Sequence, residues 1–133
     1  MQFFSLIHFI LSCYNRYLDN QYIKVISNTE YLTSLVDLSL AHNELTNIKG
    51  IGELKLLKRL NLSYNKIAYI DNKNIEPLIN LQWLDISYNK IENLIDKLDC
   101  LSSLTKLTSL LLGETIDGKN ASSNTCCKNK KYP

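Results

Sequence analysis

The sequence has little proline, little glycine and little net charge, and each shortage excludes a class of protein. With two Pro and four Gly in 133 residues, the chain is neither collagen-like nor a low-complexity linker. A formal charge of +2 gives no basic field that would by itself imply nucleic acid. The apolar run Phe3–Leu11 is far too short for a transmembrane helix. What remains, 45% hydrophobic and 21% charged residues, is the balance of an ordinary globular domain.

Motifs of catalysis and metal binding are missing as well. The sequence contains no P-loop, no G-x-G-x-x-G and no H-E-x-x-H. The two histidines, His8 and His42, have no Ser, Cys or carboxylate partner at motif spacing. The cysteines form neither a C-x-x-C pair nor a recognisable disulfide frame, which favours reduced thiols in a cytoplasmic protein. They are Cys13, Cys100, Cys126 and Cys127. We therefore expect no enzyme activity, no catalytic residue, no metal and no cofactor.

What the chain does contain is an internal repeat. The segments 35–43, 57–65 and 81–89 all read L-x-x-L-x-[LI]-x-x-N, and each continues with apolar residues two and five positions after the Asn. A degenerate copy begins at Cys13, with Arg16 in an apolar slot, and a half copy begins at Leu107. Repeat frames therefore start at 13, 35, 57, 81 and 107. Such a period is typical of a solenoid in which each repeat buries its apolar face against its neighbours.

The pattern also predicts how one repeat folds. The L-x-L core is a short strand, so Leu38 and Leu40 are expected to point inward while Asp37, Ser39 and Ala41 point outward. The segments that return to the next strand have helix-like apolar spacing. The asparagine stands where the chain turns, and there a buried amide can hydrogen-bond the backbone of neighbouring repeats. A structural asparagine ladder is therefore predicted at Asn43, Asn65 and Asn89.

These motifs resemble the leucine-rich repeats, and the period near 22 resembles their short intracellular class. The resemblance implies an α/β fold: a right-handed solenoid with a parallel β-sheet on the concave face and short helical or irregular return segments on the convex face. That class includes a regulatory subunit of protein phosphatase 1, the spliceosomal A-prime protein and several centrosomal and ciliary proteins. The resemblance thus implies a non-catalytic role in binding other proteins.

The C-terminal half resembles the last repeats of the centrosomal leucine-rich repeat and coiled-coil protein. Thr125 replaces the proline of that family's turn, Pro133 stands where its arginine would be, and no coiled coil follows. The resemblance implies a place at the centrosome or cilium base, and a chain that is a fragment without its C-terminal cap. The matching positions are Leu107, Thr108, Leu110, Leu112, Asn124, Cys126 and Tyr132.

Three segments are expected along the chain: an apolar capping segment at 1–12, the repeats at 13–117 and a polar, flexible tail at 118–133. The run Phe3–Leu11 also resembles the apolar core of a signal peptide, which makes secretion the alternative to a cytoplasmic location. No Lys or Arg precedes the run and no A-x-A site follows it. The capping interpretation is therefore favoured.

Outward positions on neighbouring strands should line up in rows on the concave face, where solenoids bind their partners. Trp, Tyr and Arg are the residue types that most often anchor protein interfaces, and the rows contain all three. The competing interpretation is that Arg59 and Asp85 form weak exposed ion pairs and that Tyr64 and Tyr88 only pack between turns. The predicted partner-binding residues are Asp37, Arg59, Asn61, Trp83, Asp85, Tyr64, Tyr88 and His42.

The sequence therefore predicts a scaffold or adaptor module that binds another protein through its concave face. The alternatives are a ribonucleoprotein subunit and a regulatory subunit of a protein phosphatase. Nucleic acid is the less favoured partner but stays open, no membrane contact is expected, and the oligomeric state stays open.

Overall fold

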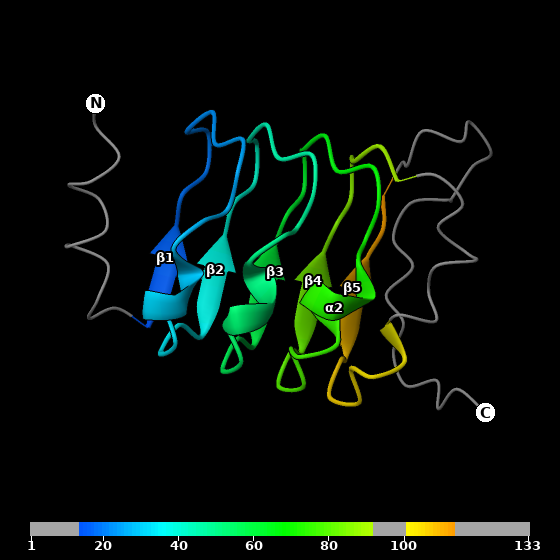
Figure 1. The fold of residues 1–133 in the computed structure, drawn as a ribbon. Coiled ribbons are helices and arrows are strands. Elements are labelled where there is room, and N and C mark those ends of the chain that lie inside the picture. The colour runs from blue at the N-terminus through cyan, green and yellow to red at the C-terminus, as the bar shows by residue number, and fades with distance from the viewer. Residues whose placement is uncertain (1–13, 92–100, 114–133) are drawn as a thin grey trace.

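Five short parallel strands form one sheet in the part of the chain that the structure describes. The structure is a computed structural model, and it describes residues 14–91 and 101–113. Consecutive strands are neighbours throughout, in the order β1-β2-β3-β4-β5 (Figure 1). Each strand is only three residues long, and the chain then turns away to cross the back of the sheet. The strands are β1 (Asn15–Tyr17), β2 (Asp37–Ser39), β3 (Arg59–Asn61), β4 (Trp83–Asp85) and β5 (Ser109–Leu111).

The strand register follows the leucine spacing of the sequence. Every strand begins two residues after the start of a predicted frame, including β1 in the degenerate repeat and β5 in the half copy. Arg59 of β3 pairs with Asp37 on one side and with Trp83 on the other, and Asn61 pairs with Ser39 and Asp85. The predicted rows of outward residues are therefore rows of the sheet.

The apolar slots of the three well-formed repeats make one continuous core. Leu60 and Leu84, at the centres of β3 and β4, are fully buried, and so are the leucines that open their frames, Leu57 and Leu81. Towards the N-terminal end the apolar residues are less buried: Leu18, Ile23 and Ile26 pack against the core but are only partly buried. Each repeat covers the next one, as a solenoid requires.

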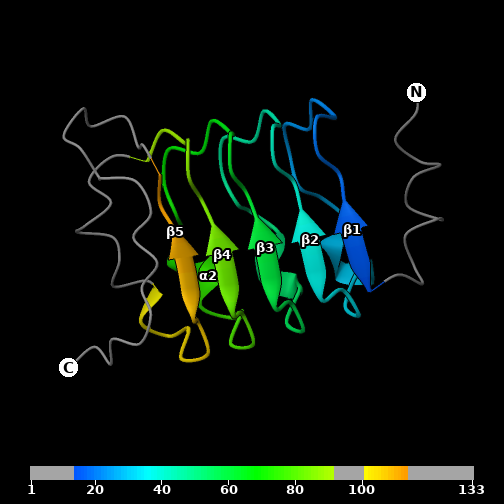
Figure 2. The same cartoon turned by 180° about the vertical axis from the view of Figure 1, so that it is seen from behind.

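The return segments are short and helical, as expected. They contain η1 (Thr29–Tyr31), η2 (Ile51–Glu53) and α2 (Asn72–Ile75), and all three lie on one side of the sheet. Figure 2 shows the opposite side, where the strands face the viewer without a covering layer. Asp71 caps α2, since its side chain accepts a hydrogen bond from the backbone N–H of Lys73. The leucine-rich repeat solenoid predicted from the sequence is therefore the observed fold.

Two of the residues expected to point outward are nevertheless buried. Ser39 and Ala41 are each only 5% exposed, although the period of the strand places them on the outward side. Neighbouring strands lie about 4.8 Å apart, so a small side chain on a narrow sheet is covered by the longer side chains beside it.

Several predicted features lie outside the described residues. They are the capping segment 1–12, the tail 118–133, all four cysteines, and the matching positions Asn124, Cys126 and Tyr132. Across 14–91 and 101–113, the structure contains no helix with the length and apolar character needed to span a membrane.

Candidate functional site

A band of interacting side chains crosses the open face of the sheet from β1 to β4. The hydroxyl of Tyr17 donates to Oδ2 of Asp37 across 3.5 Å, and the same Oδ2 lies 3.6 Å from Nε of Arg59. The guanidinium of Arg59 in turn lies over the ring of Trp83, 5.2 Å from its centroid, within the range of a cation–π contact. We call Tyr17, Asp37, Arg59 and Trp83 the face band.

The contacts within the face band are long, and Tyr17 and Arg59 are exposed to solvent, whereas the side chain of Asp37 is only 20% exposed. The side chain of Arg59 is 60% exposed, and exposed ion pairs of this kind contribute about 0–1 kcal/mol to stability. The side chains of the band can therefore exchange these contacts for contacts with another protein at little cost in free energy. Arg and Trp are also the residue types that most often dominate the energy of an interface. The band brings together three of the residues predicted to bind a partner: Asp37, Arg59 and Trp83.

Two other predicted contact residues, Asn61 and Asp85, hold the turn at the end of their own strand. Oδ1 of Asn61 accepts hydrogen bonds from the backbone N–H and the hydroxyl of Ser63, at 3.0 and 2.7 Å. Asp85 makes the same pair of bonds with Ser87, at 2.9 and 2.6 Å, and it is only 9% exposed. Asp85 stays a predicted contact residue, but its Oδ1 already satisfies the turn two residues further on.

His42, Tyr64 and Tyr88 form a stacked column of rings along the carboxyl ends of the strands. Neighbouring ring centroids are 4.2 Å apart, with interplanar angles of 10° and 13°. Tyr64 and Tyr88 are nevertheless 45% and 44% exposed, so their edges face solvent while their faces lie against one another. The alternative interpretation of the sequence, packing between adjacent turns, therefore describes the ring faces. We call these three residues the aromatic column.

The aromatic column stands on backbone in the left-handed region. The φ angles of His42, Tyr64 and Tyr88 are +54°, +55° and +53°, and Asn20 takes +58° at the equivalent position of the first repeat. Residues with a Cβ pay about 1–2 kcal/mol for this conformation. The surroundings hold it in place: the N–H of His42 donates to the carbonyl of Ser63, and that of Tyr64 to the carbonyl of Ser87.

The asparagines that follow the aromatic column link each repeat to the one before. Nδ2 of Asn65 donates to the carbonyl of Leu40 in the previous repeat and to that of Leu62 in its own, at 2.9 and 3.0 Å. Its Oδ1 accepts from the backbone N–H of Leu45. Asn89 repeats this arrangement on Leu62 and Ile67. Asn43 does so on Leu18 and Ile23. All three are buried, so their amides satisfy backbone groups that water does not reach.

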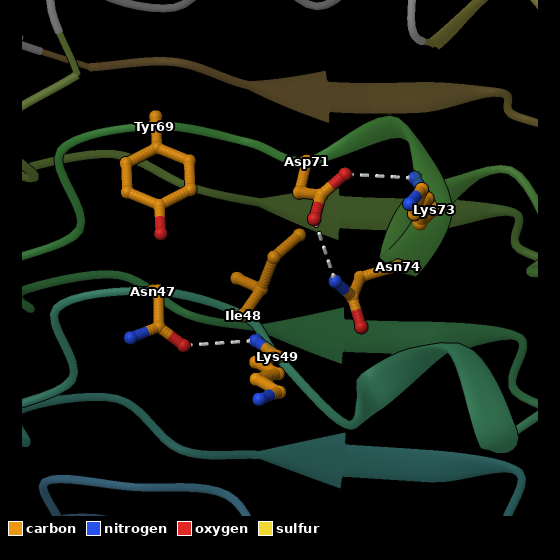
Figure 3. Close-up of a pocket in the computed structure, with 7 residues that line it drawn as sticks. All are labelled: Asn47, Ile48, Lys49, Tyr69, Asp71, Lys73 and Asn74. Atoms are coloured by element: carbon orange, nitrogen blue, oxygen red, sulfur yellow. Dashed lines mark hydrogen bonds between the residues drawn. The ribbon is translucent and has the colours of Figure 1, made fainter.

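A hollow of about 310 Å³ opens on the return side of the solenoid (Figure 3). Its carboxylate and amide groups are already engaged: Asp71 accepts from the backbone N–H of Lys73 and from Nδ2 of Asn74, and Asn47 accepts from the backbone N–H of Lys49. Because these bonds hold the return segment itself, the hollow is a feature of the scaffold. It contains none of the residues predicted to bind a partner.

Sequence reasoning missed two parts of this surface. Tyr17 is not among the predicted contact residues, although it extends the face band to β1. The serines of the turns, Ser63 and Ser87, were not selected either. The repeated Ser-Tyr-Asn of the second and third well-formed repeats was the available signal for the turns. The left-handed backbone has no signal in the residue types of these positions, since aromatic residues rarely adopt it.

The chain belongs to the leucine-rich repeat family. The family model "Leucine rich repeat" matches residues 33–91 and, in a second frame, residues 57–115. Together the two matches cover β2 to β5. Proteins of this family generally act by binding other proteins, and the fold is typically a non-catalytic interaction module.

Two relatives each match about three fifths of the chain. Osteomodulin of Bos taurus is 33% identical over 81 residues, which are 61% of this chain and 19% of that protein. Adenylate cyclase of Schizosaccharomyces pombe is 36% identical over 83 residues, which are 60% of this chain and 5% of that protein. The chain thus spans a fifth or less of the length of these relatives.

Two solved structures share the fold. An internalin from Listeria monocytogenes superposes with a TM-score of 0.69 at 29% identity, over 80% of this chain and 30% of that one. A chain in the Drosophila melanogaster SNF/U2A′ complex superposes with a TM-score of 0.66 at 26% identity, over 76% of this chain and 59% of that one.

Proposed function

We propose that this chain is a scaffold or adaptor module that docks a partner protein on the open, concave face of its sheet. The observation that carries the proposal is the face band, which places an exposed arginine over a tryptophan in the middle of the sheet. A partner that inserts a carboxylate beside Arg59 and an apolar side chain beside Trp83 would use both groups. The chain itself needs neither of them for its core.

The experiment compares an Arg59→Ala/Trp83→Ala variant with the wild type in a pull-down, with captured proteins identified and quantified. The matched control is Tyr69→Ala/Lys73→Ala, which removes an aromatic and a cation from the hollow on the return side. Circular dichroism first establishes that both variants are folded. We expect the partner to be lost with the face variant and retained with the control. Equal recovery with a folded face variant would overturn the proposal.

A second candidate function is that of a ribonucleoprotein subunit, as in the spliceosomal A-prime protein. It is supported by the likeness to a chain of the SNF/U2A′ complex, of which this chain covers a larger share than of the internalin. Under this function, RNA should copurify with the partner, and the affinity should fall steeply with salt. Nuclease treatment of the captured material separates this function from the first one, because an adaptor that binds only protein keeps its partner.

The centrosome or cilium base is the location that we propose for the scaffold, together with membership of the short, 22-residue repeat class. Both rest on the resemblance of the sequence and on the repeat frames of 22 residues at 13, 35 and 57. Imaging of the tagged full-length protein beside a centrosome marker tests the location. The phosphatase-regulator alternative makes a different prediction, namely a phosphatase catalytic subunit among the captured proteins.

A further inference from the structure

A second surface follows the carboxyl ends of the strands, beside the open face. The turns that leave β1 to β4 line up along this edge (Figure 2). An open hollow lies there between two rows of side chains, with the buried ladder residues Asn43 and Asn65 at its floor. One wall is the aromatic column. The other wall consists of residues two positions further along each repeat: Tyr22, Glu44 and Lys66, with Lys90 next in the same row.

The charges of the second wall are predominantly positive. Glu44 is shared by two lysines, since its carboxylate lies 3.7 Å from Nζ of Lys24 and 3.5 Å from Nζ of Lys66. Lys90 is exposed and forms no ion pair with any residue in the described ranges. The wall itself has two lysines against one glutamate, and Lys24 beside it raises the local excess to two positive charges.

The aromatic wall, like the charged wall, favours a negatively charged ligand. The edge of an aromatic ring carries the positive part of its quadrupole, and the face carries the negative part. In the aromatic column the rings of His42 and Tyr88 cover both faces of Tyr64 at 4.2 Å, and one face of Tyr88 is covered in the same way, so both tyrosines present edges to the hollow. Both walls therefore favour negative charge.

We infer that this edge binds an acidic, extended segment of a protein. Carboxylates spaced along such a segment would lie between the ring edges of the aromatic column and the ammonium groups of Lys66 and Lys90. The surface is separate from the face band, so the inference does not depend on the proposed function. If the same partner also docks on the open face, the two linked attachments raise the overall affinity without any new contact.

Peptide is favoured over single-stranded RNA by the same geometry. Proteins that bind single strands stack bases on open aromatic faces, and the faces within the column are taken by their neighbours. Glu44, in the middle of the charged wall, would also repel a continuous phosphate backbone, whereas a peptide can space its carboxylates to avoid it.

The test is a fluorescence-anisotropy titration of the full chain with a short labelled peptide that alternates glutamate and glycine. A glutamine-for-glutamate peptide and a labelled oligouridine are the comparison probes. The variant Lys66→Gln/Lys90→Gln removes two charges from the wall, and Lys49→Gln/Lys73→Gln removes two exposed charges from the hollow on the return side. Tyr88→Asn removes one ring while keeping a residue that tolerates the left-handed backbone, as Asn20 does.

We expect the glutamate peptide to bind more tightly than the glutamine peptide and the RNA. The Lys66→Gln/Lys90→Gln variant should weaken its binding roughly tenfold, since each exposed charge pair contributes a factor of about five or less. Tyr88→Asn should weaken it further in a fold that circular dichroism shows to be intact, while Lys49→Gln/Lys73→Gln leaves it unchanged. Equal binding of the two peptides, equal loss in both lysine variants, or tighter binding of the RNA would each overturn the inference.

Discussion

Replacing Asn65 with alanine should cost far more stability than the loss of one surface amide. The two hydrogens of Nδ2 are shared among three backbone carbonyls, and Oδ1 accepts from one backbone N–H. Asn65 is only 7% exposed, so water does not replace those bonds. At about 1 kcal/mol for each bond, with unsatisfied buried groups at the upper end, the free energy of unfolding should fall by roughly 3–4 kcal/mol.

The measurement is urea unfolding followed by circular dichroism, with Asn80→Ala as the matched control. Asn80 also donates to a backbone carbonyl of the previous repeat, that of Lys55, and its Oδ1 accepts from Nζ of Lys106, but both bonds are exposed. Their loss should cost about 1 kcal/mol, because water replaces exposed bonds. A small and similar drop in the free energy of unfolding of both variants would refute the reasoning. It would mean that the hydrogen bonds of the buried asparagine contribute no more to stability than those of an exposed one. A variant of Asn65 that is unfolded in buffer agrees with the account.

Three further predictions concern the repeats themselves. Leu60→Ala, at a fully buried position, should lower the free energy of unfolding by about 2–5 kcal/mol in the same urea assay; a loss below 1 kcal/mol would contradict the continuous core. Gly113→Ala should destabilise the last repeat, because the added Cβ would lie 2.4 Å from Cβ of Ser87 and the φ angle of +53° disfavours alanine. A thermal melt that matches the wild type would contradict this close approach. Tyr64→Val should be less stable than Tyr64→Asn by about 1–2 kcal/mol, since both lose the stacked ring but only asparagine tolerates the left-handed backbone; equal melting temperatures would contradict the assigned φ.

The sheet could be predicted from the sequence because the inward leucines are buried in only one strand register. A strand shifted by one residue would turn Leu38 and Leu40 to solvent, so the hydrophobic pattern alone fixes the register of β2 against its neighbours. The same argument locates β1, although Arg16 stands in one of its apolar slots, because the frame spacing survives the substitution. The repeats are therefore predictable from spacing.

The details of the surface depend on interactions that spacing does not contain. Whether Asp85 points to a partner or folds back depends on Ser87, whose backbone and hydroxyl groups offer two short hydrogen bonds. The left-handed φ of Tyr88 is imposed by the ladder and by the neighbouring repeats, against the preference of the residue itself. Likewise, the helix-like spacing of Ile48, Ile51 and Leu54 yields only the short η2, since few residues are available to cross the back of the sheet.

The central claim is that the open face of the sheet binds a partner, and one affinity comparison tests it most directly. Calorimetric titration of the identified partner would be carried out with the wild type, with Arg59→Ala/Trp83→Ala and with Tyr69→Ala/Lys73→Ala. We predict that the face variant raises the dissociation constant by about thirtyfold or more, which corresponds to the loss of about 2 kcal/mol at an interface anchor. The return-side variant should leave the dissociation constant unchanged. An unchanged affinity in the folded face variant, or an equal loss in both variants, would contradict the claim.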